Sequence, residues 1–204
     1  MRRPLPLVSE LAAASSLDGA EHLHFACNGC GDCCRRLRVA LTHRALERLI
    51  GAVHVPATSL VAWLSPDEVD PSEDGANFAL LPGGPRLMVL AQDSGACRLL
   101  GPDGRCTAYD ARPLDCRLYP FVLERDSEQR TTGLLPFDPA GCGERRDQAE
   151  RLTELDHMDS ERWSELAEYQ TLVARWNRFA RHRDRLGHRT RGEAEFLAFL
   201  GIPT

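Results

Sequence analysis

Apolar residues recur at steps of three and four after residue 41, and this spacing predicts an amphipathic helix. Thr42 supplies an N-cap for this helix, and Gly51 supplies a C-cap. A second, short helix is predicted over residues 57–64, followed by an acidic, proline-containing loop over 65–75. His43 lies beside the first cap, where a lone histidine is more typical of a surface residue than of a metal ligand.

The longest helical pattern lies near the C-terminus. Asp159 or Ser160 can cap a helix that continues to about Leu186 and stops at Gly187. Its large apolar residues recur at helical spacing, which is typical of a stripe that faces the core. This predicted stripe consists of Trp163, Leu166, Tyr169, Val173, Trp176 and Ala180. A last helix is predicted over residues 193–200.

Between the helical regions, short apolar runs alternate with glycine and proline. Residues 78–81 and 86–90 flank a Pro-Gly-Gly-Pro turn and predict a β-hairpin. Residues 97–100 and 105–108 flank Gly-Pro-Asp-Gly, which is strong turn chemistry, and predict a second hairpin. A further pair of strands is predicted from two later runs, 118–123 and 132–137.

Cysteine gives the chain its candidate chemistry. Four of the eight cysteines fall within residues 27–34, in a Cys-x2-Cys-x2-Cys-Cys pattern, and four follow singly. Thiolates favour zinc, copper(I) and iron–sulfur clusters, and a Cys-x2-Cys step lets one tight turn direct two sulfurs at one metal. Gly29 and Gly31 suit that turn because glycine adopts positive φ without steric cost. The predicted metal or cluster ligands are Cys27, Cys30, Cys33, Cys34, Cys97, Cys106, Cys116 and Cys142.

The adjacent pair Cys33 and Cys34 bears on how the cysteines divide between metal shells. Neighbouring side chains diverge by about 100° in a helix and by about 180° in a strand. We therefore expect the pair to serve two shells, or two edges of one larger cluster. The second hairpin brings Cys97 toward Cys106, and the turn or helix that follows carries Cys116. At least six cysteine sulfurs are expected in one contiguous group.

These patterns together predict an α+β fold, an irregular, metal-stabilised, cysteine-rich domain with short β-hairpins and a helical C-terminal part. Only 6% of the chain is aromatic, so metal coordination is expected to supplement a modest core. From residue 145 onward cysteine is absent and glycine is scarce. We divide the chain into a poorly ordered segment over 1–20, a cysteine-cluster metal-binding domain over 21–145, and a helical extension over 146–204 packed on it.

Composition narrows the compartment and the function classes. The net charge of −5 argues against a general nucleic-acid partner, and the absence of lysine among the 25 basic residues excludes Schiff-base chemistry on lysine. No run approaches the roughly 20 apolar residues of a membrane span. Pro4, Pro6 and Glu10 interrupt the apolar region that a signal peptide needs. A cytoplasmic location is therefore expected, where thiols stay reduced and disulfides are disfavoured.

An arginine-rich segment lies at the end of the long predicted helix. Seven arginines gather between residues 175 and 191, together with Trp176 and Phe179. A solvated helix end is the simplest interpretation of this segment. Binding of an anionic partner, such as RNA or a protein, is the alternative.

The cysteine pattern extends into a longer motif that resembles a known family. The residues that carry the resemblance are Phe25-x-Cys27-x2-Cys30-Gly31-x-Cys33-Cys34-Arg35, Gly95-x-Cys97-x-Leu99, Gly104-x-Cys106-x2-Tyr109-x2-Arg112-Pro113-x2-Cys116-Arg117-x-Tyr119-Pro120-Phe121, and Cys142-Gly143. Over about residues 25–143 the chain is similar to the YkgJ-type cysteine-cluster family, with its CxxCxxCC motif, which is described as zinc- or iron-chelating or as iron–sulfur-containing. At the last site that family often shows Cys-Pro-Gly, whereas Gly143 directly follows Cys142 here.

The resemblance implies a metal-binding protein that holds an iron–sulfur cluster or zinc. Cysteine spacing alone fits both, and the family description favours iron–sulfur. A related group, the flagellin lysine N-methylases, carries a similar cluster and uses S-adenosylmethionine, so a metal-dependent transferase is the alternative function. The chain lacks the Cys-x3-Cys-x2-Cys signature of radical S-adenosylmethionine enzymes and the motifs of common nucleotide-binding and hydrolase classes. The sequence therefore assigns neither a reaction nor catalytic residues.

Overall fold

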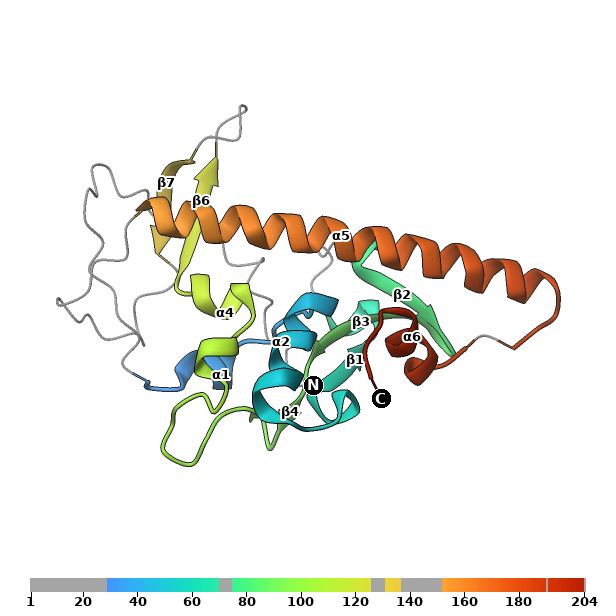
Figure 1. Ribbon diagram of the computed structural model, residues 1–204, viewed down its shortest axis with the longest axis horizontal. Coiled ribbons are helices and arrows are strands. Elements are labelled where there is room, and N and C mark those ends of the chain that lie inside the picture. The colour runs from blue at the N-terminus through green and yellow to red at the C-terminus, as the bar shows by residue number, and fades with distance from the viewer. Residues whose placement is uncertain (1–28, 70–74, 126–130, 137–151, 190, 204) are drawn as a thin grey trace.

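The computed structural model describes residues 29–69, 75–125, 131–136, 152–189 and 191–203. In chain order, the first half contains α1 (Asp32–Arg36), α2 (His43–Val53), α3 (Ala57–Leu60), β1 (Val61–Leu64), the 3-10 helices η2 (Pro66–Glu68) and η3 (Gly75–Asn77), β2 (Phe78–Leu81) and β3 (Gly84–Leu90). The second half contains β4 (Gln92–Asp93), β5 (Ala96–Cys97), η4 (Tyr109–Ala111), α4 (Leu114–Leu118), β6 (Phe121–Arg125), β7 (Thr131–Pro136), α5 (Leu152–Arg185) and α6 (Glu193–Phe199). Figure 1 shows α5 crossing the molecule, with β6 and β7 near its start and with β2 and α6 beside its later turns. The predicted α+β fold class is confirmed.

A three-stranded antiparallel sheet, ordered β1-β3-β2, supports the fold. Strands β2 and β3 form the hairpin that was predicted around Pro-Gly-Gly-Pro, with Phe78 opposite Leu87. The predicted helix over 57–64 is wrong in its second half, because the helix ends at Leu60 and the chain enters β1. Strand β1 pairs along its whole length with β3, which comes later in the chain, so this strand depends on a partner that local spacing does not reveal.

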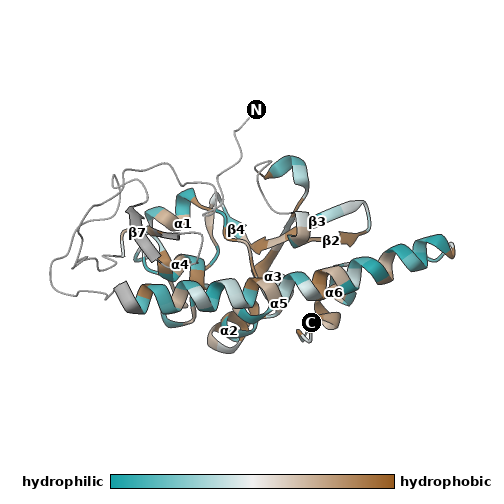
Figure 2. Cartoon of the chain, turned by 90° about the horizontal axis from the view of Figure 1, so that it is seen from above, coloured by the Kyte–Doolittle hydropathy of each residue, from teal (hydrophilic) through white to brown (hydrophobic). Residues whose placement is uncertain are grey.

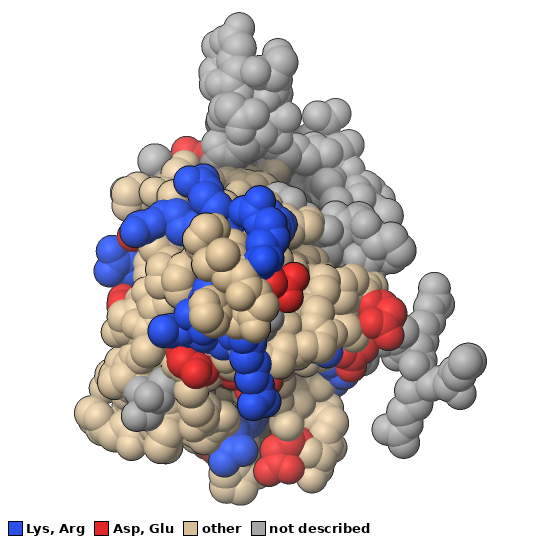
Figure 3. All heavy atoms as spheres, turned by 90° about the vertical axis from the view of Figure 1, so that its right-hand side faces the viewer, with Lys and Arg blue, Asp and Glu red and all other residues tan. Residues whose placement is uncertain are grey.

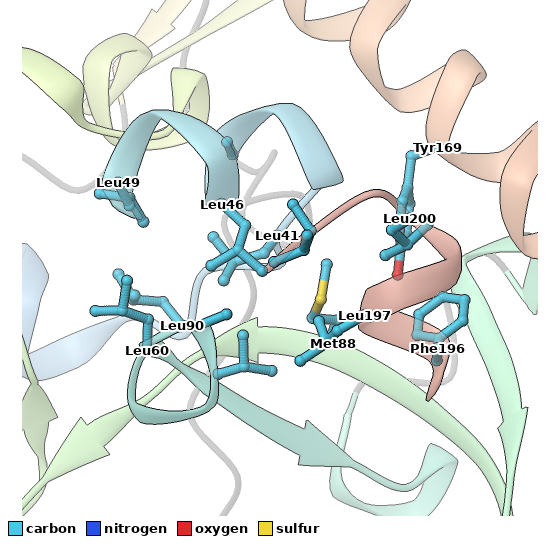
Figure 4. Close-up of a cluster of buried hydrophobic side chains, with 14 of the residues drawn as sticks. Leu41, Leu46, Leu49, Leu60, Met88, Leu90, Tyr169, Phe196, Leu197 and Leu200 are labelled. Carbon is cyan, nitrogen blue, oxygen red and sulfur yellow. The ribbon is translucent and has the colours of Figure 1, made fainter. Parts of the chain in front are cut away.

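The main core forms where this sheet meets α2, α5 and α6, as Figure 4 shows. Leu46 and Leu49 of α2, Met88 of β3, Val173 of α5 and Phe196 of α6 are all fully buried in it. Burying a leucine-sized side chain stabilises a fold by roughly 1.5–3 kcal/mol. The two C-terminal helices therefore contribute to the same core as the sheet.

Helix α2 begins as the sequence predicts but ends later. The Thr42 hydroxyl accepts a hydrogen bond from the Ala45 N–H at 3.1 Å, which confirms the N-cap. The predicted C-cap at Gly51 is wrong, because the helix continues to Val53. It is His54, with φ of 53°, that adopts the left-handed conformation and donates its N–H to the last turn. His43 is also buried rather than at the surface, with its ring stacked near that of Tyr169.

Helix α5 begins at Leu152, earlier than predicted. Asp159 lies inside the helix, and its carboxylate accepts a hydrogen bond from Arg162 Nε at 3.0 Å instead of capping a first turn. Most of the predicted stripe is buried, but Trp163 is 52% exposed, so its assignment to the core is wrong. Figure 2 shows mainly hydrophilic residues on the side of α5 seen from above, in keeping with a single buried stripe. The last helix, α6, matches its prediction to within one residue.

The smaller strand pairs differ in how well the sequence predicts them. Strands β6 and β7 pair as predicted, in antiparallel register, although the first predicted run begins too early, because Leu118 ends α4 and β6 begins at Phe121. In the second predicted hairpin, only Leu100 and Cys106 form a bridge, while β4 and β5 form a separate two-residue pair just before it. The turn itself closes with Gly101 N–H donating to the Arg105 carbonyl at 2.7 Å. Within the described ranges, no helix is both long and apolar enough to cross a membrane.

Candidate metal site

The structure brings five cysteines to one cavity of about 380 Å³. They come from four separate segments: α1, β5, the residue that bridges to Leu100 after the hairpin turn, and α4. The five cysteines are Cys33, Cys34, Cys97, Cys106 and Cys116. None of the six cysteines in the described part of the chain forms a disulfide.

Glycines let the first segment approach the turn of the second hairpin. Gly29 and Gly31 both have positive φ, of 71° and 69°, as the turn argument requires. A Cβ on Gly31 would lie 2.8 Å from the carbonyl oxygen of Gly104, so a side chain there would push the two segments apart. This close backbone contact places the start of α1 against the segment that carries Cys106.

Helix α1 presents two adjacent cysteines to the cavity. The Sγ atoms of Cys33 and Cys34 lie 4.0 Å apart, and both residues line the cavity. In a tetrahedral zinc shell, with Zn–S bonds of 2.3 Å, neighbouring sulfurs are about 3.8 Å apart. The two side chains therefore diverge less than the predicted two-shell arrangement assumes.

The second hairpin and its turn bring Cys97 and Cys106 together. Leu100 N–H donates to the Cys97 carbonyl at 2.9 Å, and Thr107 N–H donates to the Leu99 carbonyl at 2.8 Å. These bonds fold residues 97–107 back on themselves, so that a cysteine at each end of the turn faces the same space. The sequence prediction that this turn pairs the two cysteines agrees with the structure.

Cys116 lies on α4, and Arg112 braces the turn that leads into this helix. The Arg112 guanidinium donates to the Tyr109 carbonyl at 2.8 Å and lies 3.5 Å from the Cys116 carbonyl. It also lies 3.7 Å above the centre of the Tyr109 ring. Arg112 and Tyr109 thus support the cavity from beside its cysteines.

The other side of α4 is held by α5 through a residue that sequence reasoning missed. Arg162 lies 3.4 Å from the Asp115 carboxylate, and its guanidinium also contacts Asp159 at 2.9 Å. Burial raises the pKa of the Asp115 carboxyl, and the Arg162 charge opposes that rise. Asp115 precedes Cys116 directly, so this contact fixes the helix that carries the cysteine. A contact between positions 47 residues apart gives no local sequence signal.

The thiols of the cavity influence one another strongly. The pKa of Cys33 is raised well above the usual value, mainly by the hydrogen bond between Cys33 and Cys34 and secondly by burial. For Cys34, the bond with Cys33 lowers the pKa, but the bond with Cys97 and burial outweigh it and raise the pKa to about 12. The bond with Cys34 lowers the pKa of Cys97, and burial raises that of Cys116. Such crowded thiols do not all ionise together without a cation to balance them.

The structure does not place the other three predicted ligands in this group. Cys30 is exposed and does not line the cavity, although its carbonyl accepts a hydrogen bond from Arg35 at 3.0 Å. Cys27 and Cys142 fall outside the described residues. Five of the six described cysteines therefore share the cavity, and the expectation of at least six in one group stays a prediction. As the side chains of the described residues stand, no three His, Cys, Asp or Glu groups converge closely enough to hold a metal ion.

Comparison with known proteins agrees with this picture of the cysteines. Neither a curated protein nor a solved structure matches the chain. A family model named CxxCxxCC, described as "Putative zinc- or iron-chelating domain", matches residues 26–136. That span covers more than half of the chain and includes every cavity cysteine, while α5 and α6 follow it. The chain therefore belongs to the CxxCxxCC family of zinc- or iron-chelating domains.

Proposed function

We propose that this protein binds an iron–sulfur cluster through its cysteines. The observation that supports the proposal is the cavity of about 380 Å³, whose lining includes five thiols from four segments. Thiolates are the protein ligands of iron–sulfur clusters, so the donor set suits this cofactor. Cys27, Cys30 and Cys142 are the other cysteines of the proposed ligand set, and since one cluster takes four cysteines, not all eight bind a single cluster.

The size of the cavity favours a cluster over a single zinc ion. Four thiolates around one zinc ion draw their sulfurs to within about 3.8 Å of each other and close the site around the metal. The Cys33 and Cys34 sulfurs have nearly this spacing, but the cavity that all five cysteines line has a volume of about 380 Å³, which exceeds the space of one zinc ion. A cluster fills such a space with its own iron and inorganic sulfide.

The rest of the cavity wall suits a cluster as well. Leu37, Val39 and Leu99 give the cavity an apolar side that limits contact with water. Arg112 sits at the wall and favours the ionised form of Cys33, which helps to balance the negative charge of several thiolates. Burial and nearby donors of this kind set the reduction potential of a bound cluster.

Metal analysis of anaerobically purified protein tests the proposal. We expect bound iron with matching acid-labile sulfide and a visible sulfur-to-iron charge-transfer band. Cys106→Ser should reduce both, whereas Thr58→Ser, at an exposed position on α3, should reduce neither. A colourless protein with stoichiometric zinc and no sulfide would overturn the cluster in favour of zinc.

The proposal concerns binding and not a transfer reaction. The sequence alternative, a metal-dependent transferase that uses S-adenosylmethionine, requires the protein to bind that compound. We expect calorimetric titration of the loaded protein with S-adenosylmethionine to give no saturable heat. Saturable binding that depends on the loaded cluster would favour the transferase instead.

A further inference from the structure

The later turns of α5 carry a row of arginines that faces away from the core. We call Arg175, Arg178, Arg181 and Arg185 the basic stripe; all four are exposed. At 100° per residue they fall within an arc of about 120°, which lies opposite the buried Val173, Trp176 and Ala180. Figure 3 shows blue arginine side chains gathered on the end of the molecule where α5 finishes. The stripe extends for about 15 Å along the helix axis.

Helix stability alone does not account for this stripe. Arginine near a helix C-terminus complements the helix dipole, but that effect falls off within the last turn. Arg175 and Arg178 lie earlier than the last turn. Like charges at spacings of three and four residues destabilise a helix. Between residues 175 and 191 there are seven arginines and a single acidic residue, Asp184.

In the first half of α5, by contrast, charged side chains form ion pairs within the fold. Carboxylates there pair with arginines of α2, as in the contacts of Glu168 with Arg44 and of Glu165 with Arg48. Among the carboxylates of the described ranges, none forms an ion pair with an arginine of the basic stripe. The same helix therefore has one half whose charges are matched within the fold and one half whose charges are available to a partner.

Exposed apolar side chains border the basic stripe. Phe179, Leu186 and Phe199 remain 40%, 59% and 36% exposed. Arg175 lies 5.9 Å from the ring centre of Phe199, and Arg183 and Arg191 lie 5.7 and 5.6 Å from that of Phe179. Arginine together with aromatic residues is the composition enriched at protein–protein interfaces and among their hot spots.

We propose that the basic stripe binds an acidic helical segment of a partner protein. Carboxylates spaced three and four residues apart on such a helix repeat at the same interval as the four arginines, and guanidinium groups bind carboxylates bidentately. The apolar side chains at the border give a protein partner contacts that a phosphate backbone would not use. The whole chain has a net charge of −5, so the molecule beyond this segment is strongly acidic and repels a long polyanion. This inference is independent of the proposed cluster.

Fluorescence anisotropy with a labelled model peptide tests the inference on the full-length protein. The probe is a helical peptide with glutamates on one face, at spacings of three and four residues, and leucines beside them. Arg178→Gln/Arg181→Gln should weaken its binding about tenfold, which corresponds to about 1.4 kcal/mol. Arg98→Gln/Arg117→Gln removes the same charge at two exposed positions away from α5 and should change affinity less than about twofold.

Further probes separate this partner from other anions. A scrambled peptide of equal charge, with its glutamates dispersed around the helix, should bind more weakly than the one-faced peptide. Phe179→Ser should weaken peptide binding without changing its salt dependence, because it removes an apolar contact and no charge. Equal loss in the two double variants would overturn the proposal. Tighter binding of polyuridylate RNA or of phosphatidylserine vesicles than of the peptide would also overturn it.

Discussion

The core and the cysteine cavity of this protein are built by different means. The core is formed by long elements, an 11-residue α2, a seven-residue β3 and a 34-residue α5, whose apolar side chains interlock. The cavity is framed by five-residue helices α1 and α4 and by the two-residue strands β4 and β5. Helices this short are marginal in water, and strand pairs this small are not stable alone.

This difference indicates where the stability of each region comes from. The core gains its stability from apolar burial, which the chain supplies by itself. The cavity brings thiols together between short segments at the edge of the core, and under the proposed function a bound metal cofactor would crosslink those segments. Metal coordination supplies such a crosslink, because the binding free energy becomes free energy of folding. The comparison therefore predicts that the two regions fail under different treatments.

Removal of the metal should have the largest effect, and that effect should be local. We expect chelation to cost on the order of 5 kcal/mol, because structural thiolate sites contribute strongly to folding. Amide protection should fall over 29–36 and 96–118 and persist in β3 and in the middle of α5. Hydrogen exchange with mass spectrometry measures both. Uniform loss of protection across the chain, or no loss at all, would contradict the prediction that the metal stabilises the cavity segments and not the core.

Trp176→Ala should destabilise the other region, the hydrophobic core. Trp176 is 2% exposed, its Nε1 donates to the Leu80 carbonyl at 2.8 Å, and its ring lies 5.1 Å from that of Phe196. Truncation of a buried tryptophan costs about 3–5 kcal/mol. Denaturant unfolding should show this loss globally.

Trp163→Ala is the matched control for this substitution. Trp163 lies on the same helix but is half exposed, so its removal should cost less than about 0.5 kcal/mol. Similar losses for the two variants would show that the core does not have the packing described above. Metal content measured before unfolding should be unchanged in the control.

The two regions also differ in how far the sequence predicts them. The first hairpin is predictable because its turn residues and its flanking apolar runs are adjacent in the chain. The Thr42 cap and the glycines of the cysteine turn are predictable for the same reason. The sequence named all eight cysteines as candidate ligands, and five of the six that the structure describes line the cavity.

The features that sequence reasoning missed depend on distant partners. Strand β1 was predicted as helix because its pairing with β3 is not local. Trp163 fits the three- and four-residue spacing of the stripe, but it is 52% exposed, whereas Leu155, earlier on the same helix, is buried. Asp159 has the chemistry of an N-cap, yet Arg162 and the packing of α4 place it inside a longer helix. In each case tertiary contacts override a correct local preference.

Arg162→Met should weaken the connection between the two regions. The substitution leaves the buried Asp159 carboxylate, and the partly exposed Asp115, without their arginine. Breaking a fully buried pair costs about 3–5 kcal/mol, and we expect about 1–2 kcal/mol here because the contact is partly open to solvent. A purely structural role would lower stability alone. A positioning role for Cys116 should also lower metal retention at a temperature where the protein stays folded.

Arg162→Lys separates these two outcomes. Lysine restores the positive charge without the planar fork that spans both carboxylates, so stability should recover more than metal retention does. Metal analysis after dialysis against a weak chelator measures retention. Full retention of metal in Arg162→Met would contradict the positioning role.

Thr42→Ala should have the smallest effect and should act on the core alone. The Thr42 hydroxyl caps α2 and also donates to Glu165 of α5 at 3.1 Å. Loss of an N-cap costs about 1 kcal/mol, and Thr42→Ser should recover most of it because serine caps as well as threonine does. Helix α2 contributes to the core and does not line the cavity, so metal retention should equal that of the wild type in both variants. Metal retention that falls together with unfolding stability in Thr42→Ala would show that the core and the cavity unfold as one cooperative unit. The two regions would then differ in their secondary structure but not in what stabilises them.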